Sequence, residues 1–346
     1  MKYNRLGTSG LFISELGFGA MTFGENEGHP TLGGLGQAEA NTLVARAYEA
    51  GVNLFDTADN YAQGASERFL GEALRGLGVP REKYLIATKA FSPMGGGPND
   101  AGASRGHLLD AAKNSLKRLG VDHIDLYQIH GFDPATPIEE SLRALDDLVR
   151  QGHVRYVGVS NWAAWQIAKA IGVSERLGIA RFASLQAYYS VAGRDIEREI
   201  APLLLSEGVG LLIWSPLAGG FLSGKKLRGA AAPDGSRWSA NPFPPLDEDR
   251  GYNALDVMRP IAEAHGASIA QIALAWLLHQ KVVSSVLVGA KRMDQLDDNL
   301  KAASISLSQE ERAAISKVSE LPGEYPGWMF GFQGQGRLAQ VASSNR

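Results

Sequence analysis

The 346-residue sequence contains no cysteine. This absence excludes disulfide bonds, thiolate nucleophiles and thiolate metal ligands as sources of stability or chemistry. The seven histidines are not arranged with a metal-binding spacing such as H-E-x-x-H. We therefore expect no metal centre.

An excess of one charge and long hydrophobic runs are also missing. Thirty-seven acidic residues against 34 basic ones give a net charge of −3, which does not favour nucleic acid or an anionic membrane as the main partner. The longest apolar stretches, such as VGLLIW at 209–214, are far shorter than a membrane span. The first residues, MKYNRLGTSGLFISELG, hold no apolar run of signal-peptide length. We expect a cytoplasmic protein without a nucleic-acid or membrane partner.

The sequence does contain eight short apolar runs separated by longer helical patterns. The runs lie at 14–20, 51–58, 83–89, 125–130, 154–160, 182–189, 209–215 and 284–290. Continuous hydrophobicity of this kind is typical of parallel strands buried on both faces. The clearest helical patterns lie at 37–51, 104–120 and 138–152. Eight strand–helix repeats predict an α/β fold, a closed (β/α)₈ TIM barrel, with a doubly wound sheet as the alternative.

We see no domain boundary and predict one domain over residues 1–346. Residues 1–15 should form a hairpin with a Gly/Ser turn, ahead of the first barrel strand. Gly- and Pro-rich loops are expected at 24–36, 90–103 and 218–253, the last being a long insertion after the seventh strand. We expect the aromatic stretch 325–330 to pack against the domain and residues 333–346 to be a flexible tail.

Chemistry in a barrel lies at the C-terminal ends of its strands, where this sequence places Asp56, Tyr61, Lys89 and His130. An ammonium group favours a nearby phenolate and lowers the pKa of the phenol, and a carboxylate holds the ammonium in place. A histidine can hydrogen-bond a bound carbonyl. Such a set suits proton transfer to a carbonyl oxygen while a hydride, which only a cofactor can supply, reaches the carbon.

Each of these residues also has a purely structural explanation, such as a helix-start aspartate or a surface lysine. Other enzyme classes have weaker support in the sequence. GVSNW does not match the G-x-S-x-G nucleophile motif, and GFGAMTFG does not match the G-x-G-x-x-G dinucleotide motif. A barrel glycosidase would need paired carboxylates, and an aldolase would need a dry Schiff-base lysine.

Five motifs follow one another at the predicted strand ends: FDTADNYAQGASERFLGEAL, YLIATK, DLYQIHGFD, VGVSNW and WSPLAGGFLSGK. In this order they resemble the aldo-keto reductase superfamily, and the resemblance extends over about residues 3–320. The variants are most similar to the branch that holds aryl-alcohol dehydrogenase-like reductases and potassium-channel β-subunits.

The resemblance implies a role for each of the four residues Asp56, Tyr61, Lys89 and His130, which we call the tetrad. Tyr61 would be the general acid in reduction and the base in oxidation, Lys89 and Asp56 would tune it, and His130 would orient the carbonyl. Cofactor contacts are implied for Thr22, Ser160, Asn161, Gln186, Trp214, Ser215, Pro216, Leu217, Gly219, Lys225, Arg237, Gly289, Lys291, Gln295, Asp298 and Asn299. The long loop after the seventh strand would cover the cofactor. Several cations near the adenosine end favour NADPH/NADP⁺ over NADH.

The resemblance implies NADPH-dependent reduction of an aldehyde or ketone to the alcohol, with oxidation as the reverse reaction. Phe23, Phe91, Phe132 and Trp162 would line the substrate pocket, with Trp328 of the tail as a further candidate, which favours hydrophobic or aromatic carbonyls. The alternative is an NADPH-binding sensor subunit with little turnover. Channel-type subunits have asparagine at the position of His130, which favours the enzyme. Beyond the carbonyl substrate, a homo-oligomeric partner is possible in this branch.

Overall fold

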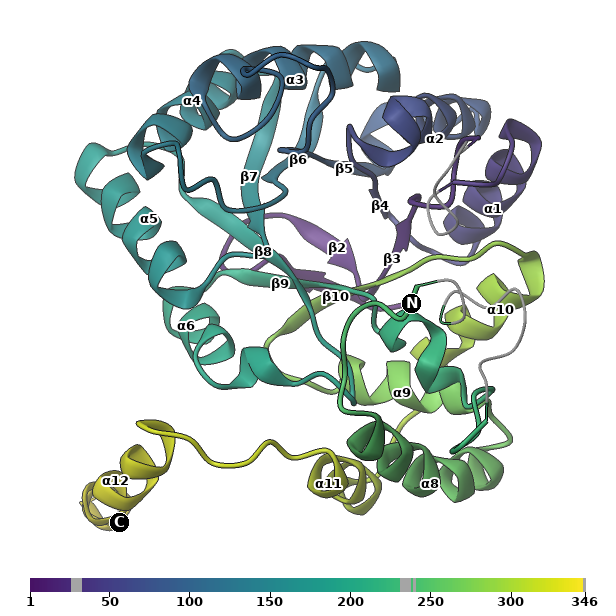
Figure 1. Cartoon of the computed structure of the whole chain (residues 1–346), viewed down its shortest axis with the longest axis vertical. Coiled ribbons are helices and arrows are strands. Elements are labelled where there is room, and N and C mark those ends of the chain that lie inside the picture. The colour runs from purple at the N-terminus through teal and green to yellow at the C-terminus, as the bar shows by residue number, and fades with distance from the viewer. Residues whose placement is uncertain (26–32, 231–237, 239–240, 345–346) are drawn as a thin grey trace.

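The computed structural model describes residues 1–25, 33–230, 238 and 241–344. Eight parallel strands form a closed barrel in the order β10-β3-β4-β5-β6-β7-β8-β9, and helices surround it (Figure 1). The strands are β3 (Leu16–Gly19), β4 (Leu54–Asp56), β5 (Leu85–Ala90), β6 (Ile124–Ile129), β7 (Val154–Ser160), β8 (Phe182–Tyr188), β9 (Gly210–Trp214) and β10 (Val283–Val288). They confirm the eight predicted strands and exclude the doubly wound sheet.

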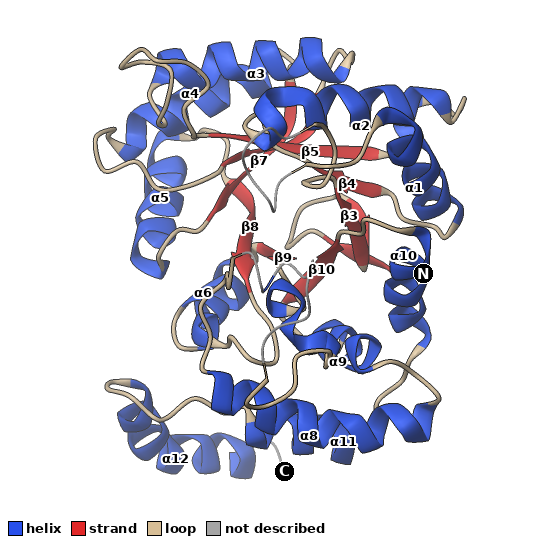
Figure 2. Cartoon of the chain, turned by 45° about the vertical axis from the view of Figure 1, so that its right-hand side comes forward, coloured by secondary structure: helices blue, strands red, loops and turns tan. Residues whose placement is uncertain are grey.

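Each strand is followed by a helix that packs on the outside of the barrel (Figure 2). These helices are α1 (Gln37–Glu49), α2 (Ala65–Gly76), α3 (Arg105–Leu119), α4 (Ile138–Arg150), α5 (Ala164–Leu177), α6 (Ile200–Glu207), α8 (Glu248–His265), α9 (Ile269–Leu278), α10 (Met293–Lys301) and α11 (Gln309–Val318). The helices expected at 37–51, 104–120 and 138–152 are confirmed as α1, α3 and α4. Ser104 accepts a hydrogen bond from the His107 backbone N–H, as an N-cap does.

The predicted hairpin is present and closes one end of the barrel. β1 (Tyr3–Arg5) pairs antiparallel with β2 (Phe12–Ser14). Its side chains Leu6 and Ile13 are fully buried, and they form one cluster with inward-facing strand residues. The strand members of this cluster are Leu54, Ala87, Leu126, Leu212 and Leu287. The hairpin therefore covers an apolar layer at the N-terminal end of the strands.

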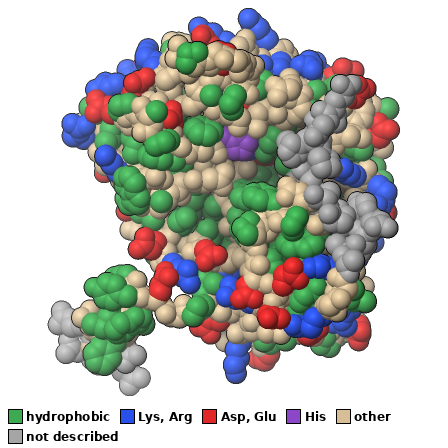
Figure 3. Space-filling view, in the orientation of Figure 1, with side chains coloured by type: hydrophobic (Ala, Val, Ile, Leu, Met, Phe, Trp, Pro, Cys, Tyr) green, Lys and Arg blue, Asp and Glu red, His purple; other side chains and the backbone are tan. Residues whose placement is uncertain are grey.

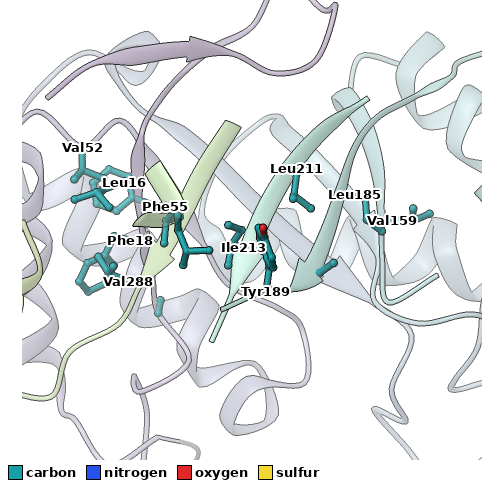
Figure 4. Packing of buried hydrophobic residues seen from close by; sticks show 14 of the residues in the cluster. Leu16, Phe18, Val52, Phe55, Val159, Leu185, Tyr189, Leu211, Ile213 and Val288 are labelled. Carbon is teal, nitrogen blue, oxygen red and sulfur yellow. The ribbon is translucent and has the colours of Figure 1, made fainter. Parts of the chain in front are cut away.

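The inside of the barrel changes from apolar to polar along the strands. Successive side chains of a strand point to opposite faces, so residues two positions beyond the apolar layer also point inward. These inward residues are Asp56 in β4, Lys89 in β5, Gln128 in β6, Gln186 in β8 and Trp214 in β9. Outward-facing side chains such as Phe18, Phe55 and Ile213 build the larger apolar core between strands and helices (Figure 4). The polar site is thus confined to the C-terminal end.

Two segments differ from the sequence predictions. The insertion after β9 is partly helical, because η4 (Ala218–Ser223) begins it and α8 starts at Glu248. The tail forms helix α12 (Gly327–Ser344), where a flexible segment was expected from residue 333. Figure 1 shows α12 away from the barrel, joined to α11 by an extended segment. The predicted packing of residues 325–330 is wrong, because Tyr325, Trp328 and Phe330 are 57–75% exposed.

Among the described residues, no single helix is long and apolar enough to cross a membrane. Helices α8 and α9 meet the length and composition criteria only when taken together, across a bend of 97°.

Helix α2 approaches α3 so closely that only glycine fits at one position, which gives a test of the packing. A Cβ on Gly71 would lie 2.1 Å from the backbone oxygen of Leu119, whereas a Cβ on Gly172 in α5 would meet nothing within 4 Å. We expect Gly71→Ala to lower the free energy of unfolding by about 1–3 kcal/mol through overpacking. Gly172→Ala should raise it by about 0.5–1 kcal/mol through helix propensity. Denaturant unfolding measures both, and equal effects would contradict the packing.

Candidate active site

A buried ion pair lies at the centre of the C-terminal end of the barrel. The Lys89 Nζ atom donates to Asp56 Oδ1 at 2.6 Å and to the backbone oxygen of Thr57 at 2.7 Å. The Lys89 side chain is 0% exposed and that of Asp56 is 5% exposed. Burial by itself lowers the pKa of the Lys89 ammonium, but the charges and hydrogen bonds of Asp56 and Tyr61 more than offset this and raise it. Lys89 therefore remains a cation at neutral pH.

Two glutamines hold the second oxygen of Asp56. Its Oδ2 atom accepts from Gln186 Nε2 at 2.9 Å and, more weakly, from Gln128 Nε2 at 3.4 Å. Gln186 was expected to bind a cofactor carboxamide, and one donor of its amide is already engaged by Asp56. Gln128 was not among the residues predicted for the site, although it lies in β6 two residues beyond the inward-facing Leu126 and therefore also points inward.

The remaining tetrad members lie next to this pair. The Lys89 Nζ atom lies 5.1 Å from the centre of the Tyr61 ring, and the rings of Tyr61 and His130 meet edge to face with centroids 5.7 Å apart. Burial, together with the positive charge of Lys89, lowers the pKa of His130 to about 3. The imidazole is therefore neutral at physiological pH, and it can form hydrogen bonds but cannot supply the proton of an imidazolium.

Asn161 joins the ends of three strands. Its Nδ2 atom donates to the His130 backbone oxygen at 3.2 Å and to Ser160 Oγ at 3.0 Å, while Oδ1 accepts from Trp214 Nε1 at 3.0 Å. The φ angle of Asn161 is +60°, a left-handed conformation that asparagine tolerates better than most residues. The Trp214 ring stacks on Phe243 with an interplanar angle of 7° and centroids 5.7 Å apart. Ser160, Asn161 and Trp214 are thus brought together as predicted.

The turn after β9 is tightly wound, and the Ala218 and Gly220 N–H groups donate to the backbone oxygens of Ser215 and Leu217 at 2.9 and 3.0 Å. Ser215, Ala218, Gly219 and Gly220 all have positive φ angles. Ser215 Oγ accepts a hydrogen bond from the Gly219 N–H at 3.0 Å, which closes the turn. The same turn includes Pro216, which is buried, and Leu217, which is half-buried; Lys225 is exposed at its far end.

The predicted cofactor residues from Gly289 to Asn299, which the resemblance places at the adenosine end, separate into two groups. A cavity of about 370 Å³ lies between α1 and the start of α10, and its lining includes Lys291 and Arg292. Arg292 is paired with Asp294 at 2.8 Å, whereas Lys291 has no ion pair among the residues described. Gln295 instead accepts from the Lys291 backbone N–H at 3.0 Å.

The other predicted residues of this region face the packing between elements. Asp298 accepts from Ser268 Oγ and Gln271 Nε2 of the α9 N-terminus, and Asn299 is 7% exposed. Thr22 donates to the Ala290 backbone oxygen at 3.3 Å, just beyond Gly289. Arg237 lies outside the described residues.

The substrate wall differs from the prediction. Phe23 is 0% exposed and packs against Phe18 with ring centroids 5.5 Å apart, so its predicted place in the pocket wall is wrong. Trp162 is 4% exposed, beneath Phe132. Trp165, which was not among the predicted pocket residues, is 59% exposed and lies beside Phe132 with centroids 6.2 Å apart. The chain reverses direction at Ala163 to start α5, and this turn places the second tryptophan at the rim.

Phe91 and Phe132 are half-buried, and the Phe91 ring lies against the backbone of Gly131. Trp328 lies on α12, away from the strand ends (Figure 1). Figure 3 shows a histidine in a hollow at the centre of one face, with hydrophobic side chains around it.

A second buried carboxyl group lies behind the tetrad. Asp59 is 0% exposed, and its backbone N–H donates to the Lys89 backbone oxygen at 3.0 Å. Neither of its carboxyl oxygens has a hydrogen-bond partner among the described residues. Burial, followed by the negative charge of Glu67, raises the pKa of Asp59 to about 7, against the opposing charges of Arg118 and Lys89. Asp59 therefore titrates near neutrality.

The pKa of Asp59 predicts a pH-dependent stability. The unfolded chain loses this proton near pH 3.8 and the folded protein near pH 7, so the group contributes stability at low pH that is lost as the pH rises through 7. We expect Asp59→Asn, which cannot ionise, to gain about 1–3 kcal/mol of unfolding free energy relative to wild type between pH 5 and pH 8. Denaturant unfolding at both pH values measures this, and a pH-independent difference would contradict it.

Comparisons with known proteins agree with this geometry. The model of the family described as "Aldo/keto reductase family" matches residues 15–320. The chain is 39% identical over 312 residues to a "Probable voltage-gated potassium channel subunit beta" of Arabidopsis thaliana, covering 88% of this chain and 92% of that protein. It is 34% identical over 329 residues to a "Versiconal hemiacetal acetate reductase" of Aspergillus parasiticus, covering 90% and 95%.

A barrel whose strand ends carry this tetrad, matched by a family model from residue 15 to residue 320, identifies the chain as a member of the aldo/keto reductase family.

Proposed function

We propose that the protein is an NADPH-dependent reductase that converts an aldehyde or ketone to the alcohol, with Tyr61 as the proton donor. The observation that carries the proposal is the buried Lys89–Asp56 pair beside the Tyr61 ring, with a neutral His130 on the other side. A permanent cation next to a phenol favours the phenolate that remains after proton transfer. The same site can take the proton back in alcohol oxidation.

The electrostatics decide between the two candidate acids. His130 is a neutral imidazole at neutral pH, because burial and the nearby Lys89 disfavour its cation, and the N–H that a neutral imidazole keeps is a hydrogen-bond donor but a very weak acid. Its role is then to hydrogen-bond the substrate carbonyl and orient it toward the phenol. The Nδ1 atom of His130 is buried and has no hydrogen-bond partner in the described part of the chain. Tyr61 is therefore assigned the proton transfer and His130 the orientation of the substrate.

The residues present fit a nicotinamide dinucleotide phosphate. The part-exposed Trp214 ring is held by Asn161 and stacks on Phe243, and a planar nicotinamide ring could take the place of Phe243 on it. The glycines of the turn from Ser215 to Gly220 let a pyrophosphate approach the backbone closely, and Lys291 provides a charge at the adenosine end. The cofactor, when bound, supplies the hydride that no side chain can supply. The chain's own part is to bind it, to orient the carbonyl and to deliver the proton.

A sensor with little turnover is the second candidate, because relatives that are 39% identical are named potassium-channel β-subunits. The complete tetrad favours the enzyme. The reductase named among the relatives likewise favours carbonyl chemistry. Cofactor binding without turnover of any carbonyl in a varied panel would favour the sensor.

The role of Tyr61 is tested by Tyr61→Phe, which removes one oxygen and leaves the ring. We expect kcat for carbonyl reduction to fall at least about 100-fold, while the Kd for NADPH stays within about twofold, because only the proton donor is lost. Tyr84→Phe is the matched control, since Tyr84 precedes β5 at the opposite end of the barrel and stacks under Arg81. Reduction by Tyr61→Phe at the wild-type rate would refute the assignment.

Cofactor preference is tested by separate changes at Lys291 and Arg292. Because Arg292 is already paired with Asp294, Lys291 is the better candidate for the 2′-phosphate. We expect Lys291→Ala to raise the KM for NADPH about tenfold and to leave that for NADH unchanged, as loss of a charge-assisted hydrogen bond would. Arg292→Ala should have the smaller effect. An equal loss for both cofactors would show that Lys291 does not contact the phosphate.

A further inference from the structure

The loop that carries Tyr61 has an unfavourable backbone conformation. Ala62 and Gln63 have φ angles of +46° and +51°, and Gly64 follows with +80°. Side chains with a Cβ rarely adopt such angles, and three in succession persist only where the surroundings fix them. Something outside the loop must therefore hold it in place.

Glu67, in the first turn of α2, provides this hold. It is 0% exposed, and its Oε1 atom accepts from Thr88 Oγ1 at 2.6 Å. Its Oε2 atom accepts from Arg118 Nε at 2.5 Å, and the Arg118 Nη2 atom also donates to Ser115 Oγ in α3. Thr88 directly precedes Lys89 in β5. One carboxylate thus joins the helix that follows Tyr61 to the strand that carries Lys89.

Arg118 also supports the loop by direct packing. A Cβ added to Gly64 would lie 2.6 Å from the Arg118 Cδ atom, so the arginine side chain fills the space that any larger residue would need. The side chain of Ser66 adds a second tie. Its Oγ atom donates to the Ala20 backbone oxygen at 2.7 Å and lies 2.8 Å from Thr57 Oγ1. Gly64 occupies the N-cap position of α2.

We propose that the buried Glu67–Arg118 ion pair is a positioning element that fixes the Tyr61 phenol at the Lys89 ammonium. The proposal rests on the role proposed for Tyr61. Neither residue belongs to the tetrad, and both act through the loop and through β5. A buried charge whose partner is removed is strongly unfavourable, so the loss of one member should disturb the strained loop first.

The structure offers a matched control at the other end of the barrel. The Arg81 Nη2 atom pairs with Asp125 Oδ2 at 2.5 Å, and the two side chains are 21% and 3% exposed, against 19% and 0% for Arg118 and Glu67. Asp125 also accepts from the Ile86 backbone N–H at the beginning of β5. The two pairs have the same charges and similar burial, and the carboxylate of each accepts a hydrogen bond from β5. They differ in position, because Asp125 binds the beginning of β5 and Glu67 binds Thr88, next to Lys89.

The test compares Glu67→Gln with Asp125→Asn in the full chain. We expect Glu67→Gln to lower kcat for Tyr61-dependent carbonyl reduction about 10- to 100-fold, because a small displacement of a proton donor has effects of this size. The KM for the aldehyde and the Kd for NADPH should stay within about twofold. Asp125→Asn should leave kcat within about twofold, even where thermal unfolding shows a similar loss of stability.

A second measurement does not need turnover. Tyrosinate absorbance is titrated with pH in each protein and in the same protein carrying Tyr61→Phe. The difference between the two curves reports the ionisation of Tyr61. Removing a negative charge would by itself favour the phenolate and lower the midpoint of this titration. Displacement from Lys89 has the opposite sign, so we expect Glu67→Gln to raise the midpoint by about one pH unit and Asp125→Asn to leave it unchanged. If the wild type reduces no carbonyl, the proposed function fails, and this titration still tests the positioning role.

Arg118→Lys extends the test if Glu67→Gln does not fold. It keeps the positive charge but loses the Nε donor and the packing at Gly64, so its kcat and midpoint should lie between those of wild type and Glu67→Gln. Wild-type kcat and midpoint in both variants would overturn the proposal. Equal effects of Glu67→Gln and Asp125→Asn would also overturn it, because they would reduce the pair to general stability.

Discussion

The site depends on keeping the Lys89 ammonium charged inside the protein. A lysine that is 0% exposed loses its hydration, and this loss favours the neutral amine. The protein offsets it with the Asp56 carboxylate at 2.6 Å and with the backbone oxygen of Thr57. Asp56 is satisfied in turn by amides from β6 and β8. The ion pair joins the neighbouring strands β4 and β5, and Gln186 reaches Asp56 from β8, so closure of the barrel completes the contacts of the carboxylate.

One buried cation lies beside two further members of the tetrad. The charge of Lys89 adds to burial in keeping His130 neutral, and the Lys89 Nζ atom lies 5.1 Å from the centre of the Tyr61 ring. In the mechanism that we propose, this shared neighbour gives the histidine and the tyrosine different roles. In the described structure, the charged side chains Asp56 and Lys89 lie inside the barrel at the C-terminal end of the strands. The N-terminal end, which the hairpin covers, is filled by aliphatic side chains.

A layer of polar contacts beneath the tetrad keeps these distances fixed. The left-handed residues after Tyr61 would not hold their conformation alone, and Ser66, Glu67 and Arg118 connect them to β3, β5 and α3. Asn161 has a similar function on the other side, where it joins His130, Ser160 and Trp214. The proposed chemistry thus depends on residues that never touch a substrate.

The sequence by itself determined the barrel, the hairpin and the positions of the tetrad, because strand periodicity and chain order are local properties. It also gave the order of motifs by which the family is recognised. Tertiary structure alone decided which neighbours each side chain meets. Phe23 is buried in the core, Trp165 is exposed and Gln128 donates to Asp56. Sequence periodicity could not give these contacts, because it shows which face of an element a side chain lies on but not which residues it meets there. The pairing of Arg292 with Asp294, which leaves Lys291 without an ion pair in the described chain, likewise depends on side-chain geometry that no sequence pattern specifies.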